Sequence, residues 1–95
     1  MTYKIFVTSE IKIFFSYIDN KSARIIKQHL KKLEEYPYPG KGPGDKEKLP
    51  VRGKQRYRLH ISRTWTVFYS ILEDKKQVRI SEILSIDDAH KKYGY

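Results

Sequence analysis

The residues of this chain best suited to chemistry lie in one short segment, 56–61, in which cationic or titratable side chains alternate with apolar ones. Successive side chains of a β-strand point to opposite faces, so the alternation predicts a strand with its apolar members buried. Arg56, Arg58 and His60 then form the opposite row. Neighbours in such a row lie about 6.5 Å apart, close to the spacing of successive phosphates in a nucleic acid strand. The row therefore predicts a surface that binds a polyanion.

The charge around this strand supports the same prediction. No acidic residue occurs from 48 to 72, and Arg52, Lys54 and Arg63 flank the strand. The chain of 95 residues has a net charge of +9, which favours nucleic acid, an anionic membrane or an acidic protein as partner. We predict that Arg52, Lys54, Arg56 and Arg63 contact RNA. Because no apolar run approaches the roughly 18 residues of a spanning helix and no signal peptide opens the chain, we expect a cytoplasmic protein without membrane contact.

Several classes of catalytic site are excluded by composition. The chain has no cysteine, which removes disulfides, thiolate nucleophiles and cysteine zinc sites. Its three histidines, His29, His60 and His90, show no metal-ligand spacing, so we expect neither a metal nor another cofactor. His60 is a candidate for proton transfer, because an imidazole can accept or donate a proton near neutral pH. The alternative is a surface histidine that contacts phosphate without doing chemistry.

The C-terminal segment supplies a second group of candidates. His90, Lys91, Lys92 and Tyr93 place cationic and aromatic side chains next to one another. Lysine holds phosphate and tyrosine stacks on an unpaired base, which is how single-stranded RNA is commonly bound. We predict that His90, Lys91 and Lys92 contact RNA. The alternative is a frayed, solvated terminus.

The remaining pattern predicts the elements that position these residues. Alternation at 3–7 predicts a first strand, and apolar residues at helical spacing predict two helices that begin near Thr8 and Asp19. After a connector rich in glycine and proline, alternation predicts three strands, at 57–61, 65–71 and 78–86, with a bulge or a sheet edge near Glu82. We expect residues 1–95 to form one α+β domain of order β-α-α-β-β-β. The helical hairpin should pack on one face of a mostly antiparallel sheet and leave the other face free to bind.

These elements and residues together resemble the RelE/ParE superfamily of toxins from type II toxin-antitoxin systems, over nearly the whole chain. The family's strand core reads approximately Tyr-Arg-Leu-Arg-Val-Gly-Asp-Tyr-Arg-Val-Ile-Tyr, and residues 57–69 are similar to it. Residues 49–53 are similar to the Leu-x-Gly segment that precedes this core, and residues 34–37 to the Asn-Pro close of the second helix. The resemblance is closest to the RelE branch.

The RelE branch implies a metal-independent endoribonuclease that cuts mRNA in the ribosomal A site and so inhibits translation. The RNA's own 2′-hydroxyl attacks the adjacent phosphate, and the enzyme orients the reacting groups, stabilises charge and moves two protons. The resemblance places Arg58, His60 and Tyr93 at catalytic positions. It also implies a RelB-like antitoxin as protein partner, beside mRNA and the ribosome.

Two positions depart from the family pattern. Thr66 stands where an arginine is expected, and Asp88-Ala89 where a basic residue follows the last strand, with His90 or Lys91 nearest to it. The ParE branch has the same fold without the ribonuclease residues and acts on DNA gyrase, so these departures favour that alternative. A basic RNA-binding module without catalysis is the third possibility.

Overall fold

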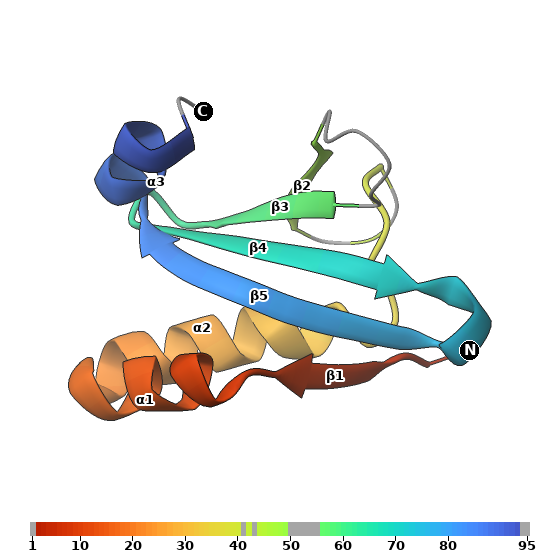
Figure 1. The fold of residues 1–95 in the computed structure, drawn as a ribbon, viewed down its shortest axis with the longest axis horizontal. Coiled ribbons are helices and arrows are strands. Elements are labelled where there is room, and N and C mark those ends of the chain that lie inside the picture. The colour runs from red at the N-terminus through yellow and green to blue at the C-terminus, as the bar shows by residue number, and fades with distance from the viewer. Residues whose placement is uncertain (1, 41, 43, 50–55, 94–95) are drawn as a thin grey trace.

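A five-stranded sheet with helices on both sides forms the protein. The computed structural model describes residues 2–40, 42, 44–49 and 56–93. Its elements follow in the order β1 (Lys4–Val7), α1 (Ser9–Tyr17), α2 (Asn20–Lys32), β2 (Asp45–Lys48), β3 (Arg56–Ile61), β4 (Trp65–Leu72), the 3₁₀ turn η1 (Glu73–Lys75), β5 (Gln77–Ser85) and α3 (Ile86–Tyr93). The strand order is β1-β5-β4-β3-β2, and all neighbours are antiparallel except β1 and β5. Figure 1 shows α1 and α2 together on one side of the sheet and α3 on the other.

The predicted helical hairpin is confirmed, including its caps. The side chains of Thr8 and Asp19 accept hydrogen bonds from backbone N–H groups in the first turns of α1 and α2. The apolar stripe of α2 packs on the sheet, so that Ile26, Leu30 and Leu33 are no more than 6% exposed. The predicted α+β class and the packing of the hairpin on one sheet face are therefore correct. No helix within the described ranges is long and apolar enough to cross a membrane.

Strands β3 and β4 supply the centre of this core. Tyr57, Leu59 and Ile61 of β3 are all buried, as the alternation predicts. The ring of Tyr57 stacks on that of Tyr69 in β4, with centroids 5.5 Å apart. The hydroxyl of Tyr69 donates a hydrogen bond of 2.7 Å to the backbone oxygen of Pro37. The helix-facing side of β3 is therefore fixed by apolar burial and by a bond to the connector.

The structure adds two elements to the predicted order. Strand β2 consists only of alternating acidic and basic residues, so it carries no apolar period and is held by its backbone ladder with β3. Helix α3 occupies most of the segment that was expected to be an RNA-binding tail. The predicted bulge is present, since Phe68 lies opposite Glu82 and Tyr69 opposite Ile80, which leaves Ser81 as the extra residue of β5.

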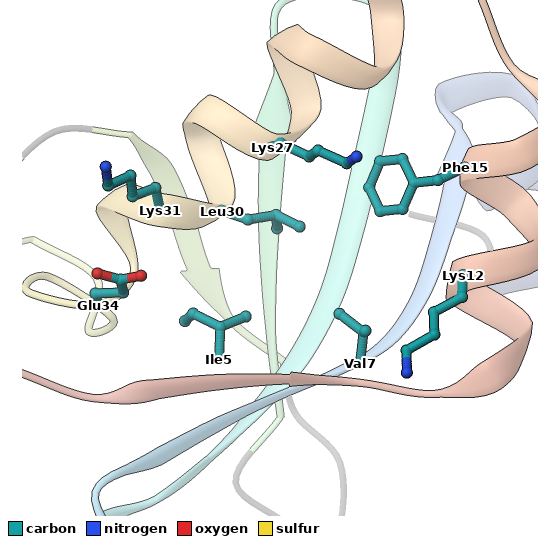
Figure 2. A pocket seen from close by; sticks show the side chains of 8 residues that line it. All are labelled: Ile5, Val7, Lys12, Phe15, Lys27, Leu30, Lys31 and Glu34. Atoms are coloured by element: carbon teal, nitrogen blue, oxygen red, sulfur yellow. The ribbon is translucent and has the colours of Figure 1, made fainter. Parts of the chain in front are cut away.

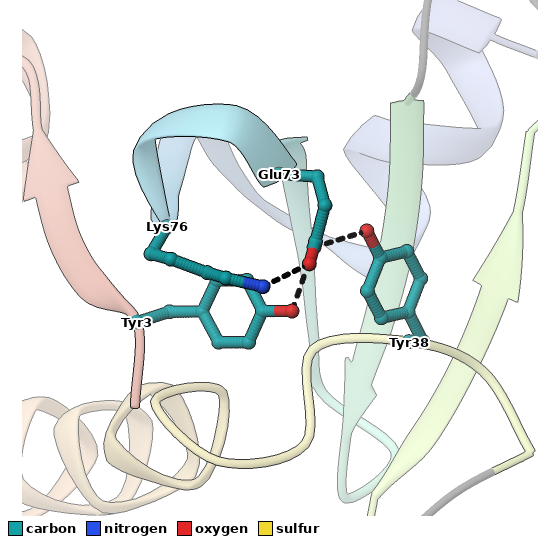
Figure 3. Close-up of polar contacts among 4 residues, drawn as sticks. All are labelled: Tyr3, Tyr38, Glu73 and Lys76. Carbon is teal, nitrogen blue, oxygen red and sulfur yellow. Dashed lines mark hydrogen bonds and ion pairs between the residues drawn. The ribbon is translucent and has the colours of Figure 1, made fainter. Parts of the chain in front are cut away.

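The carboxylate of Glu73 joins three separate segments of the chain. It accepts hydrogen bonds of 2.7 Å from the hydroxyls of Tyr3, just before β1, and Tyr38, in the connector, and it pairs with Lys76 (Figure 3). The hydrogen bonds from Lys76, Tyr3 and Tyr38 lower the pKa of Glu73 to about 2. The ionised carboxylate therefore stabilises the contact between the β4–β5 turn, the connector and the N-terminal segment.

Acid should weaken this contact in a defined pH window. The folded-state pKa of Glu73 lies below its ordinary value of 4.5, so its contribution to stability is full above about pH 4.5 and is lost as pH falls towards 2. We expect Glu73→Gln to flatten the pH dependence of the free energy of unfolding in that window, measured by urea titration. Asp74→Asn, at the next and also exposed carboxylate, is the matched control. Equal flattening in both variants would contradict the assignment to Glu73.

Candidate nucleic-acid interface

The sheet face opposite α1 and α2, called here the outer face, carries the cationic row of β3. Arg56, Arg58 and His60 are half-buried there, while the intervening residues of β3 are buried beneath α1 and α2. Pairing with β2 and β4 fixes the neighbours of each member of the row. Arg58 lies between Glu47 and Phe68 across the ladder. The row is therefore a positioned part of the sheet and not a mobile basic segment.

Arg58 is a largely enclosed cation of the row. Its Nη2 atom donates a hydrogen bond to the Glu47 carboxylate, a charge-assisted contact between neighbouring strands. The side chain of Arg58 is 12% exposed, whereas that of Glu47 is 57% exposed. The carboxylate can therefore move into solvent while the guanidinium stays in place. A phosphate that approaches Arg58 competes with Glu47 for the same donor.

His60 lies one step along the row, opposite Asp45 on β2 and Thr66 on β4. Its Nδ1 atom is 3.3 Å from the hydroxyl oxygen of Thr66, within hydrogen-bond distance. Thr66 is only 1% exposed, so its hydroxyl is fixed within the sheet. His60 and Thr66, which both stand where the family's strand core has an arginine, are thus within hydrogen-bond distance of each other.

Helix α3 covers part of the outer face. It packs on β4 and β5 through an apolar cluster composed of Leu49, Phe68, Leu84 and Ala89. Lys92 near the end of α3 pairs with Glu82 of β5 at 2.5 Å. The expectation that this face is wholly free to bind is therefore wrong. Phe68, the ladder neighbour of Arg58 on β4, belongs to this cluster.

The other predicted contacts lie around this face or outside the described residues. Arg63 is exposed in the β3–β4 turn, which bonds to the start of α3 through the backbone of Thr64 and Ile86. His90, Lys91 and Lys92 are exposed on α3. Tyr93 is the last residue of α3, and its side chain falls outside the described part of the chain, as do Arg52 and Lys54 entirely.

Sequence reasoning missed the carboxylates of this face. Glu47 directly precedes the segment that lacks acidic residues and Glu82 lies on β5 beyond it, and the ladder brings both into line with Arg58. A signal was present, because Asp45 and Glu47 alternate with lysines and so share one side of a strand. Within the described residues, no group of three histidine, aspartate or glutamate side chains is placed to hold a metal ion. The outer face therefore offers arginine, imidazole and carboxylate chemistry.

A second concave feature lies on the helical side of the sheet, between β1, α1 and α2. Figure 2 shows this groove, which has a volume of about 510 Å³ and contains apolar side chains from all three elements. Its lining consists of Ile5, Val7, Phe15, Leu30, Lys12, Lys27, Lys31 and Glu34. Three lysines against one glutamate give the groove a positive rim around an apolar floor.

Comparison with known proteins gives a family match over most of the chain. A family model described as the ParE toxin of the type II toxin-antitoxin system parDE matches residues 7–89. No curated protein matches the chain.

Solved structures share the fold at low sequence identity. RelE in an archaeal RelE–RelB complex from Pyrococcus horikoshii OT3 gives a TM-score of 0.75 at 22% identity, over 90% of this chain and 96% of that one. A YoeB dimer from Staphylococcus aureus gives a TM-score of 0.65 at 21% identity, over 86% of this chain and 94% of that one. The isolated RelE toxin of E. coli gives a TM-score of 0.65 at 13% identity, over 95% of this chain and 97% of that one. These likenesses establish the fold.

The competition at Arg58 can be tested by binding. Glu47→Gln removes the carboxylate that competes with phosphate, so we expect affinity for a fluorescein-labelled single-stranded RNA to rise several-fold at low salt. The slope of log affinity against log salt should steepen by about 0.7 for one added phosphate contact. Asp45→Asn is the control, since it changes net charge equally and lies opposite His60. Equal gains in both variants would contradict a specific competition at Arg58.

Proposed function

Because this chain belongs to the ParE toxin family and is the toxin of a type II toxin-antitoxin system, with an antitoxin as partner, we propose that it inhibits translation as a ribosome-dependent mRNA endoribonuclease of the RelE type. The observation that carries the proposal is the grouping of Arg58, Glu47 and His60 on the outer face. Exposed cations also lie on α3, which packs on β4 and β5 at the same face. The ribosome, and hence the site of action, is cytoplasmic.

The reaction needs no nucleophile from the protein. The 2′-hydroxyl oxygen of the RNA bonds to the adjacent phosphorus as the bond from phosphorus to the 5′-oxygen breaks. One proton leaves the 2′-hydroxyl and one reaches the 5′-oxygen, so the products are a 2′,3′-cyclic phosphate and a 5′-hydroxyl. The protein must align these atoms, stabilise the negative charge on the phosphorane oxygens and carry the two protons.

The outer face can supply each of these tasks. The Arg58 guanidinium is held by its strand and by packing, so it can bind the phosphorane oxygens without first being ordered. Glu47, opposite Arg58 on β2, and His60, two residues along β3, can carry the two protons. Arg56, Arg63 and the lysines of α3 would bind the RNA backbone, and Arg52 and Lys54 are proposed for the same role. The resemblance assigns Tyr93 to the catalytic group.

Loss of Arg58 should separate catalysis from binding. With purified ribosomes carrying a 5′-labelled mRNA, we expect Arg58→Ala to slow cleavage on the order of 10²-fold, as when one transition-state donor is removed. Arg24→Ala, an exposed arginine on α2, is the matched control and should leave the rate unchanged. Sedimentation with ribosomes should report similar binding for both variants. An undiminished rate in Arg58→Ala would remove this residue from the mechanism.

A second candidate function is supported by the family model itself, which is that of ParE. ParE-type members are not nucleases, and Thr66 stands where the resemblance expects an arginine. In this alternative the toxin acts on DNA gyrase. A supercoiling assay with purified gyrase separates the two candidates, because a ribonuclease leaves supercoiling unchanged while a gyrase toxin stops it and leaves mRNA intact.

We propose that the groove between β1, α1 and α2 is the binding site for a RelB-like antitoxin. Its apolar floor suits two or three apolar side chains, and its lysine rim suits carboxylates that flank them. The net charge of +9 favours an acidic partner. A segment that is disordered alone and folds on contact would bury the floor and neutralise the rim.

Charge reversal at the lysines that line the groove tests this binding site. We expect Lys27→Glu with Lys31→Glu to raise the dissociation constant on the order of tenfold or more for the antitoxin encoded beside this chain, measured by calorimetry. Lys21→Glu with Lys32→Glu is the control, on the same helix and with the same charge change but outside the groove. If the two double variants bind the antitoxin with equal dissociation constants, the antitoxin binds elsewhere on the protein.

A further inference from the structure

We propose that Thr66 is a positioning residue for His60, holding the imidazole through Nδ1 so that its Nε2 atom carries a proton and faces the RNA. The inference rests on the proposed ribonuclease function and extends it. It assigns His60 the role of proton donor and leaves the role of base to Glu47. Three features of the pair support this role: the ladder position of the two residues, the burial of the Thr66 hydroxyl and the direction of the hydrogen bond.

The ladder brings Thr66 and His60 together. They lie directly opposite each other on β4 and β3, and both side chains belong to the outer face. The distance from Thr66 Oγ1 to His60 Nδ1 is 3.3 Å. On its other side Thr66 lies opposite Leu84, an apolar residue of β5. The polar neighbour available to Thr66 across the ladder is therefore His60.

Burial explains why this contact should persist. Thr66 is 1% exposed, and a hydroxyl removed from water without a partner destabilises the folded state. Within the residues that the structure describes, His60 Nδ1 is the side-chain partner of this hydroxyl. Threonine is also restricted about its first side-chain torsion in a strand, so Oγ1 is fixed more closely than a serine hydroxyl would be.

The direction of the hydrogen bond sets the position of the proton. When the imidazole is neutral, Nδ1 can accept the hydrogen of the Thr66 hydroxyl, and the ring proton then resides on Nε2. When the imidazole is protonated, Nδ1–H donates to Oγ1 instead, because a hydroxyl can both donate and accept. The bond therefore holds the ring in either protonation state. Nε2 makes no hydrogen bond to the part of the chain that is described, so it is the atom open to a ligand.

This arrangement defines what His60 can do during cleavage. In the neutral state Nε2–H donates a hydrogen bond to a phosphoryl oxygen. In the protonated state Nε2 passes its proton to the departing 5′-oxygen as the bond from phosphorus to that oxygen breaks. Removal of the 2′-hydroxyl proton then falls to a different group, and we assign it to the Glu47 carboxylate, which pairs with Arg58 across the ladder. A threonine and a histidine thus replace two arginines of the family pattern with one oriented donor.

Another histidine provides an internal contrast. His29 Nδ1 is 2.8 Å from the backbone oxygen of Ile25, and a carbonyl oxygen can only accept. Neutral His29 must therefore carry its proton on Nδ1. We expect His60 and His29 to show opposite tautomers in the ¹H–¹⁵N spectrum of the ring nitrogens, recorded at about pH 8, where an ordinary imidazole is neutral. This measurement requires no substrate and no activity.

Three variants of the whole chain test the assignment by that spectrum. Thr66→Val keeps the shape of the side chain and removes the hydroxyl, so the His60 nitrogens should shift towards the tautomer mixture of a free imidazole. Thr66→Ser keeps the hydroxyl and should retain most of the wild-type pattern. Thr64→Val, at an exposed threonine of the neighbouring turn, should change nothing. A His60 ring protonated on Nδ1 in the wild type, or unshifted nitrogens in Thr66→Val, would overturn the proposal.

Cleavage on programmed ribosomes provides the second measurement. We expect Thr66→Val to lower kcat on the order of tenfold to 10²-fold with little change in KM, and Thr66→Ser to restore most of it. In a His60→Ala background, Thr66→Val should have no further effect, because Thr66 acts through that ring. If the losses in kcat from Thr66→Val and His60→Ala were additive, Thr66 would have a role that does not depend on His60. If the wild type cleaves no mRNA, the ribonuclease proposal fails, and the tautomer of His60 still decides whether Thr66 orients the ring.

Discussion

The register of β3 is the constraint on which the rest of the structure depends. Tyr57, Leu59 and Ile61 are each no more than 3% exposed beneath the helical hairpin. A slip of one residue would bring these side chains into solvent and drive Arg58 and His60 into the core. Each large apolar side chain so exposed would cost about 1.5–3 kcal/mol, and burial of an unpaired guanidinium would cost more. The burial that stabilises the domain therefore also positions the residues proposed to bind RNA.

Electrostatics on the outer face follow from that position. The face is not uniformly cationic, because Glu47 pairs with Arg58 and Glu82 with Lys92. Arg58 is largely enclosed while its carboxylate partner is mostly in solvent, so the pair keeps a guanidinium oriented until a phosphate replaces the carboxylate. Helix α3 covers the outer face on the side of β4 and β5, and its lysines lie at the edge of that face. In the proposed function, this shielded but oriented cation would bind one conformation of the RNA on the ribosome.

The sequence predicts the parts of this molecule in which apolar periodicity is strong. The helical hairpin, its caps and the alternation of β3 all follow from such periods, and with them the face on which Arg58 and His60 lie. Strand β2 could not be predicted, because Asp45–Lys48 has no apolar residue and depends on a ladder with β3. For the same reason the pairing of Arg58 with Glu47 was hidden. The contact between Thr66 and His60 required a register across the β3–β4 turn that alternation alone does not give.

The central claim is that this toxin cuts mRNA on the translating ribosome through the outer face. Primer extension on a reporter mRNA, after brief induction of the chain in cells without its antitoxin, tests the claim most directly. The account predicts cuts that share one position within the codons and disappear when the start codon of the reporter is removed. Intact mRNA in cells that stop growing, together with relaxed plasmid DNA, would contradict the account and indicate action on gyrase.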